Sequence, residues 1–142
     1  MIRLTRRYKF SAAHRLHSPE LSAAANSEIY GKCNHPHGHG HDYLLDVSVR
    51  GPVDPRTGLV VDVRTLDRLV DSQIISRLGH RNLNREVDEL AGLSPTTEHL
   101  ARAVSDILLH NWRGFFPAGV PRLDRVRIHE TKRNIFEVAP VQ

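Results

Sequence analysis

Nine consecutive residues, Cys33 to His41, read CNHPHGHGH and contain the one cysteine and four of the ten histidines of the chain. Sulfur and imidazole nitrogen donors at this density suit a borderline metal ion such as Zn²⁺. Side chains two apart in a strand point to the same face, so a strand that begins at His39 lets His39 and His41 bind one ion. Gly40 between them is expected to let the neighbouring backbone pass close. The segment therefore predicts two ligands of one metal site.

A third ligand is expected from the start of the chain. Apolar residues fall on the even positions from Ile2 onward, which is typical of a strand and places His14 on its apolar face. A catalytic zinc site has about three protein ligands and one open position, which a water molecule fills. We therefore predict a zinc site formed by His14, His39 and His41. The alternative is a solvated histidine-rich loop that binds metal only incidentally. Three other histidines lack such a context and are expected to be structural or surface residues: His17, His99 and His110.

The length and composition are those of one globular unit. A chain of 142 residues suits a single domain, residues 1–142, with 39% hydrophobic and 25% charged residues. We find no signal-peptide pattern and no apolar stretch of about 18 residues, so the cytoplasm is the expected location. Cys33 has no second cysteine to pair with. It is therefore a buried residue without a chemical role, a metal ligand or a reactive thiol.

The net charge of +4 comes mostly from arginine, which suits either nucleic acid or a phosphate-bearing substrate. The arginines are scattered along the chain, aromatic residues make up only 6% of it, and no nucleic-acid-binding motif accompanies them. A basic nucleic-acid-binding module is therefore the alternative from a different functional class, and it would bind in a salt-sensitive and zinc-independent manner.

Two helices are expected in the middle of the chain. Asp62 is a good N-cap, and apolar residues recur at helical spacing after it until Gly79 ends the pattern. Ser94 and Pro95 are expected to open the second helix, with the proline in its first turn, and this helix ends near residues 112–114.

Strands and irregular segments surround these helices. The strands are predicted over residues 2–14, 39–50, 123–131 and 134–138, the last two forming a hairpin around Lys132 and Arg133. Residues 15–32 are expected to be a long functional loop, residues 51–58 a turn, and residues 80–93 irregular. The order strand, strand, helix, helix, strand, strand predicts an α+β fold, an antiparallel sheet with both helices on one face. A neighbouring subunit is the natural cover for the other face.

Several motifs together resemble the 6-pyruvoyltetrahydropterin synthases and the related 6-carboxytetrahydropterin synthases. The resemblance covers nearly the full length of the chain. It is carried by FSAAH (10–14), SPELSAAANSEIYGKC (18–33), HGH (39–41), GLVVD (58–62), HRNLN (80–84), PTTEHLA (95–101) and HETKRN (129–134).

The resemblance implies the tunnelling fold, in which trimers stack into hexamers, sheets join into a barrel and each active site is shared between subunits. It also implies the zinc ligands His14, His39 and His41. Cys33 matches the catalytic thiol of the family, and His80 matches its catalytic histidine. The residues expected to bind the pterin are Glu130, which anchors the ring, and Thr96, Thr97 and Glu98, which form part of the wall.

By the same resemblance the substrate is 7,8-dihydroneopterin triphosphate, and the activity is that of a carbon–oxygen lyase that releases triphosphate. The six-residue spacing from Cys33 to His39 is that of the pyruvoyl-forming branch, whereas a shorter spacing to His37 would suit the carboxy-forming branch of the queuosine pathway. A hydroxymethylpterin-forming enzyme is a further alternative. The family usually has an aspartate before the catalytic histidine, and this chain has Gly79 there. Another carboxylate, such as Asp88, would then have to serve His80, or the chain is a pterin- or zinc-binding homologue without synthase activity.

Overall fold

The computed structural model of the chain describes residues 1–141. Gln142, the last residue of the expected domain of residues 1–142, lies outside the described residues. None of the helices within residues 1–141 is long and apolar enough to cross a membrane.

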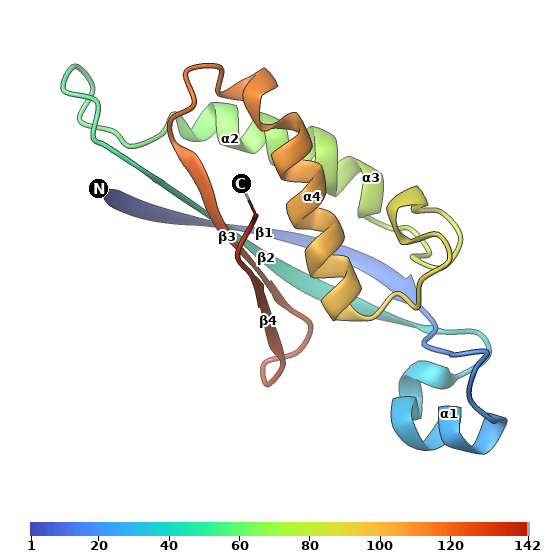
Figure 1. Cartoon of the computed structure of the whole chain (residues 1–142). Helices are drawn as coiled ribbons and strands as arrows, with labels where there is room; N and C mark the ends of the chain where they lie inside the picture. The colour runs from blue at the N-terminus through green and yellow to red at the C-terminus, as the bar shows by residue number, and fades with distance from the viewer. Residues whose placement is uncertain (142) are drawn as a thin grey trace.

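Four antiparallel strands form one sheet in the order β1-β2-β3-β4 (Figure 1). They are β1 (Ile2–His14), β2 (His39–Gly51), β3 (Arg122–His129) and β4 (Ile135–Val138). The predicted α+β class and all four predicted strands are confirmed. The pairing of β1 with β2 places His14 directly opposite His39, so that the chain leaves and re-enters the sheet at one point.

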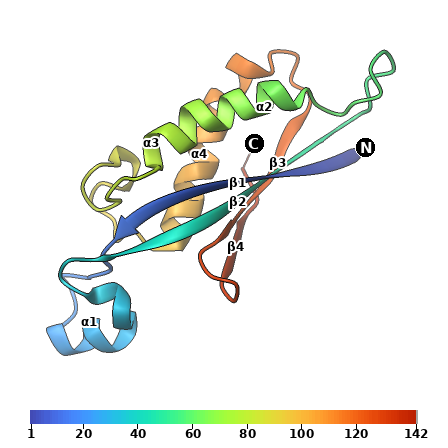
Figure 2. The ribbon, with the colours of Figure 1, turned by 180° about the vertical axis from the view of Figure 1, so that it is seen from behind.

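Alternation along the strands separates an apolar face from a charged one. Phe10, Tyr43 and Val126 belong to the buried core between the sheet and the helices. The opposite face carries charged side chains, among them Arg7, which donates two hydrogen bonds to Asp46 at 2.7 and 3.0 Å. Figures 1 and 2 show the long helices on one side of the sheet only, as predicted.

The first predicted helix is confirmed as one helical run in three segments, α2 (Val63–Val70), the π-helical η2 (Asp71–Ile75) and α3 (Ser76–Leu78). The Asp62 side chain accepts a hydrogen bond from the Arg64 N–H at 3.0 Å and caps the N-terminus. Gly79 follows the last helical residue with an extended backbone, where the apolar pattern stops.

The second predicted helix is α4 (Thr97–Phe115), which packs on the same face of the sheet (Figure 1). The expected start at Ser94 and Pro95 was wrong by two to three residues. Thr96 is the N-cap, because its hydroxyl accepts a hydrogen bond from the His99 N–H at 3.2 Å. Pro95 therefore lies before the cap instead of within the first turn.

The expected long loop at residues 15–32 was wrong in part, since it contains α1 (Ala23–Tyr30) and leads into the 3-10 helix η1 (Gly31–Asn34). The fully buried Asn26 holds α1 in place. Its amide donates to the carbonyl groups of Ser18, Leu21 and Ser22 and accepts from the Ser18 N–H. A helix anchored by one amide has no apolar stripe, which is why periodicity does not reveal it.

Two irregular segments complete the chain. Residues 80–93 contain only the 3-10 helix η3 (Asp88–Leu90), as expected, and they lie along the outer edge of β1 through hydrogen bonds of Ala13 with Arg81 and Leu83. The connection between β3 and β4 spans residues 130–134 and is longer than the predicted two residues. The Thr131 hydroxyl accepts the N–H groups of Arg133 and Asn134 there.

Asp67 on α2 joins the helical layer to β1. Arg6 donates two hydrogen bonds to its carboxylate, at 2.6 and 2.9 Å, and the Tyr8 hydroxyl donates a third at 2.7 Å. We predict that Asp67→Asn lowers the free energy of unfolding by about 1 kcal/mol in urea denaturation, since these partly exposed groups lose a charged acceptor. Asp71→Asn, an exposed change on the same helical run, is the control and should have a smaller effect.

The predicted effect of Asp67→Asn depends on pH. Hydrogen bonding from Arg6 lowers the pKa of Asp67. A group whose pKa is lower in the folded state stabilises the fold above its unfolded-state pKa, and this contribution is lost as pH falls through the folded-state value. The difference between the native protein and the variant should therefore shrink below about pH 4. An undiminished difference at pH 3 would contradict this account.

Candidate active site

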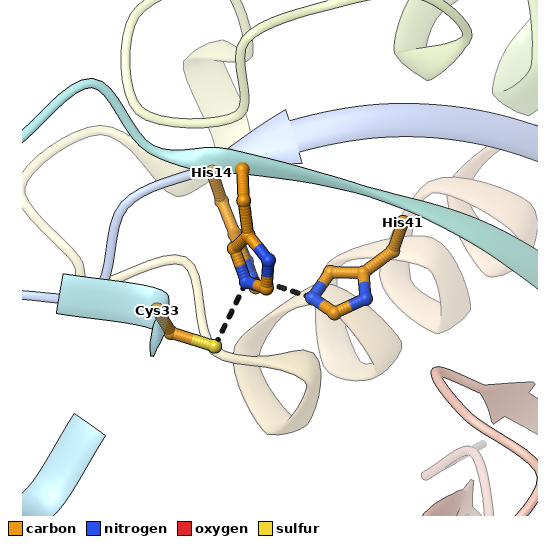
Figure 3. Close-up of side chains that lie close together, drawn as sticks. His14, Cys33 and His41 are labelled. Atoms are coloured by element: carbon orange, nitrogen blue, oxygen red, sulfur yellow. Dashed lines mark hydrogen bonds between the residues drawn. The ribbon is translucent and has the colours of Figure 1, made fainter. Parts of the chain in front are cut away.

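Four side chains converge where β1 ends and β2 begins (Figure 3). His14 is the last residue of β1, His39 and His41 open β2, and Cys33 lies in η1. Their potential ligand atoms all lie within 4.8 Å of one another. The structure thus brings together the three histidines predicted as ligands and adds the cysteine, so the chain has a cluster that could hold a metal ion.

The protonation of the histidines suits metal binding. The Nδ1 of His14 lies 2.9 Å from the Pro95 carbonyl oxygen, so this nitrogen carries the proton and Nε2 is left free. The Nε2 atoms of His14 and His41 are 3.1 Å apart. Burial lowers the pKa of both imidazoles. Both imidazoles therefore favour the neutral form that coordinates cations.

Cys33 supplies a soft donor beside these nitrogens. Its Sγ is 3.0 Å from the Nε2 of His39, and its carbonyl oxygen accepts the Leu16 N–H at 2.7 Å, which ties η1 to the end of β1. Burial raises the pKa of the Cys33 thiol, and the negative charge of Glu130 raises it further. A cation bound in the cluster would instead lower the pKa of the Cys33 thiol. Three imidazole nitrogens and one sulfur are a donor set that fits zinc.

A carboxylate and a hydroxyl form a wall next to the cluster. Glu130 follows β3, and its Oε1 lies 3.9 Å from the Nε2 of His41. The Thr97 hydroxyl, in the first turn of α4, donates a hydrogen bond to Oε2 of Glu130. One carboxylate oxygen is thus held by the protein while the other faces the cluster.

The other predicted members of this wall lie close by in the chain. Thr96 uses its hydroxyl to cap α4, and Glu98 is exposed on the first helical turn. Of the three residues at the start of α4, Thr97 is the one whose side chain meets Glu130.

His80 is not one of the four clustered side chains, although it lines the same hollow as His41. It is exposed, adopts a left-handed backbone conformation (φ 59°), and donates its N–H to the Ser11 carbonyl oxygen at 2.6 Å. It lines a hollow of about 530 Å³ with Ser11 and Asp42, which alternate with the core residues of β1 and β2. Such strained backbone at a non-glycine residue is a frequent mark of a functional position.

The neighbours of His80 differ from those expected. Asp42 and Glu86 are the carboxylate residues that line its hollow, whereas Asp88 does not line it. A Cβ atom on Gly79 would lie 2.6 Å from the Ile75 carbonyl oxygen, so the backbone here does not accept an aspartate without shifting.

Sequence reasoning missed two contributors to the site. The Pro95 carbonyl sets the tautomer of His14, and a main-chain acceptor gives no signal in the sequence. Gly38 is the second. Its φ is 71°, and a Cβ there would lie 2.7 Å from the His14 carbonyl oxygen, so Gly38 provides the close approach expected of Gly40. A Cβ on Gly40 would make only an ordinary contact, at 3.7 Å from the Ala12 carbonyl oxygen.

The chain is thus an α+β protein with an antiparallel sheet, helices on one face and a candidate metal site of three histidines and one cysteine at the strand ends. The family model described as 6-pyruvoyl tetrahydropterin synthase matches residues 3–140. The chain therefore belongs to the 6-pyruvoyl tetrahydropterin synthase family.

Individual relatives agree with this assignment. The chain is 46% identical over 133 residues to a 6-pyruvoyl tetrahydrobiopterin synthase of Drosophila melanogaster, covering 94% of this chain and 76% of the relative. It is 40% identical over 132 residues to the human protein of that name, covering 93% and 87% of the two chains. The structure of Caenorhabditis elegans 6-pyruvoyl tetrahydropterin synthase superposes with a TM-score of 0.85 at 38% identity, covering 99% and 96%.

Gly38 offers a test of how the metal cluster is built. We predict that Gly38→Ala lowers both the stability of the fold and the zinc content, because the new methyl group forces the 33–38 segment away from His14. Gly58→Ala is a matched control, since Gly58 has φ 74° but open space around its Cβ position. It should cost only about 1 kcal/mol for the left-handed conformation. Equal effects in thermal unfolding and metal analysis would show that the contact with His14 is unimportant.

Proposed function

We propose that the protein is a zinc-dependent lyase that converts 7,8-dihydroneopterin triphosphate into 6-pyruvoyltetrahydropterin with loss of triphosphate, and that it works in the cytoplasm. The observation that carries the proposal is the convergence of His14, His39 and His41 next to Cys33 and the Thr97–Glu130 wall. Membership of the family and the names of the relatives support the same activity.

His14, His39 and His41 would hold the zinc ion, and the neutral state of His14 and His41 suits this role. When bound, zinc would supply Lewis acidity that makes the carbon next to the chelated side-chain hydroxyls easier to deprotonate. The Pro95 carbonyl would keep the ring of His14 in one orientation while the reaction proceeds.

Cys33 would act as the general base. Its sulfur lies beside the cluster, within reach of a substrate whose hydroxyl groups are bound there. Proton removal and return within the substrate, together with elimination of triphosphate, rearrange the side chain without an external oxidant. Partial burial limits the access of bulk water to this sulfur.

Glu130 would orient the pterin ring. A carboxylate accepts hydrogen bonds from the ring N–H and the amino group through its two oxygens, and the bond from Thr97 restricts its rotation. Thr96 and Glu98 flank Thr97 at the start of α4 and would complete the wall of the pterin pocket.

His80 would serve the active site of a neighbouring subunit. It is exposed, is not one of the four clustered side chains, and lines a hollow together with Ser11, Asp42 and His41. A trimer or hexamer with shared active sites would bring this imidazole to the cluster of the next copy and would also cover the open face of the sheet. Asp42 and Glu86 are the carboxylates positioned to accompany it.

A second candidate function is a pterin-binding homologue without synthase activity. The observation that favours it is Gly79, where the family usually has aspartate and where a Cβ would clash with the Ile75 carbonyl oxygen. The two candidates bind the same ligands and differ in turnover.

Product analysis by mass spectrometry separates these functions. The zinc-loaded protein is incubated with 7,8-dihydroneopterin triphosphate, and we expect 6-pyruvoyltetrahydropterin and inorganic triphosphate. A carboxytetrahydropterin or a hydroxymethylpterin would identify another branch of the family. Unchanged substrate with zinc bound would favour the homologue without synthase activity.

Two substitutions in the cluster should have different effects. We predict that Cys33→Ala retains zinc but lowers kcat by at least about a hundredfold, as expected for loss of a general base. His39→Ala should lose both zinc and activity, because it removes a ligand. Metal analysis and steady-state kinetics of both variants provide the check. Full activity of Cys33→Ala would remove the thiol from the mechanism, and loss of zinc would make it a ligand.

A further inference from the structure

The hydroxyl group of Tyr43 is buried without a hydrogen-bond partner among the described residues. The side chain is fully buried. Buried polar groups are nearly always paired, and an unpaired one lowers the stability of the fold. A phenylalanine would fill the same space without this cost, so the presence of the hydroxyl group needs an explanation.

The surroundings of Tyr43 place its hydroxyl group at the base of the candidate active site. Tyr43 lies two residues after His41 on the same face of β2, with the two rings 5.4 Å apart. The Phe10 ring stacks against the Tyr43 ring, with the two ring centroids 5.1 Å apart, and fixes the orientation of Tyr43. The Thr97 side chain lies near the phenol, since it is among the groups that influence the Tyr43 pKa. A tyrosine phenol carries its proton at neutral pH and can act as a donor.

We propose, on the basis of the function proposed above, that Tyr43 is a positioning residue that donates a hydrogen bond to Thr97 when the pterin binds and so holds Glu130 in its binding orientation. The Tyr43 oxygen is too deeply buried to touch the substrate itself. It acts through Thr97, whose hydroxyl already donates to Glu130.

The hydrogen-bonding capacities of the three groups fit such a chain. The Thr97 oxygen uses its proton for Glu130 and retains lone pairs that can accept another bond. The protonated phenol is a donor in need of an acceptor. A bond from Tyr43 to Thr97 would polarise the bond from Thr97 to Glu130, because linked hydrogen bonds in a site of low dielectric strengthen one another.

Tyr43→Phe tests this role in the zinc-loaded protein. We expect binding of 7,8-dihydroneopterin, measured by isothermal titration calorimetry, to weaken about threefold to tenfold, the effect of losing one hydrogen bond. The KM for the triphosphate substrate should rise while kcat changes little. The melting temperature should be equal to or above that of the native protein, since an unpaired buried hydroxyl group is removed.

Tyr8→Phe is the matched control. Tyr8 lies on the apolar face of β1, but its hydroxyl has a partner in Asp67. Its removal should lower the melting temperature and leave the affinity for 7,8-dihydroneopterin unchanged. The two variants thus separate a hydroxyl that stabilises the fold from one that serves the site.

Coupling to Thr97 tests the proposed route. Thr97→Val should weaken binding of 7,8-dihydroneopterin, and the double variant with Tyr43→Phe should bind as weakly as Thr97→Val alone. Additive losses would overturn the action through Thr97. Unchanged affinity in Tyr43→Phe would overturn the inference while leaving the proposed function intact. Failure of the native protein to bind any pterin would overturn both.

Discussion

The pairing of β1 with β2 is the constraint on which the site depends. His14 stands opposite His39 in the register, and His41 follows on the same face. A slip of one residue between the two strands would turn their side chains to opposite faces and separate the imidazoles. The apolar residues beside the histidines in both strands oppose this slip, because Phe10 and Tyr43 pack together in the core. Packing of the core thereby maintains the geometry of the candidate metal site.

The segment between β1 and β2 leaves the sheet at His14 and returns to it at His39, directly opposite. It must bring Cys33 to the cluster, and two backbone features achieve this. The Leu16 N–H binds the Cys33 carbonyl oxygen, and Gly38 passes against the His14 carbonyl oxygen. From the opposite side, the segment before α4 offers the Pro95 carbonyl to His14. The candidate metal site is therefore supported by main-chain groups from three separate parts of the chain.

The sequence was sufficient to predict those parts of the fold that depend on periodicity. Alternating apolar residues in β1 and β2 revealed both strands and the shared face of His14, His39 and His41. Asp62 revealed the start of α2 because its side chain makes the expected cap. Helix α1 could not be predicted in this way, since a single buried asparagine holds it. The roles of Pro95 and Gly38 also escaped prediction, because main-chain contacts between distant segments depend on the three-dimensional fold.

The two faces of the sheet carry different groups of candidate active-site residues. The apolar face carries the candidate metal site and the Thr97–Glu130 wall, in which Thr97 belongs to α4. The charged face carries Ser11 and Asp42, and the hollow that they line contains His80. His41 belongs to the cluster and also lines this hollow, so the two groups of residues meet at one end of the sheet.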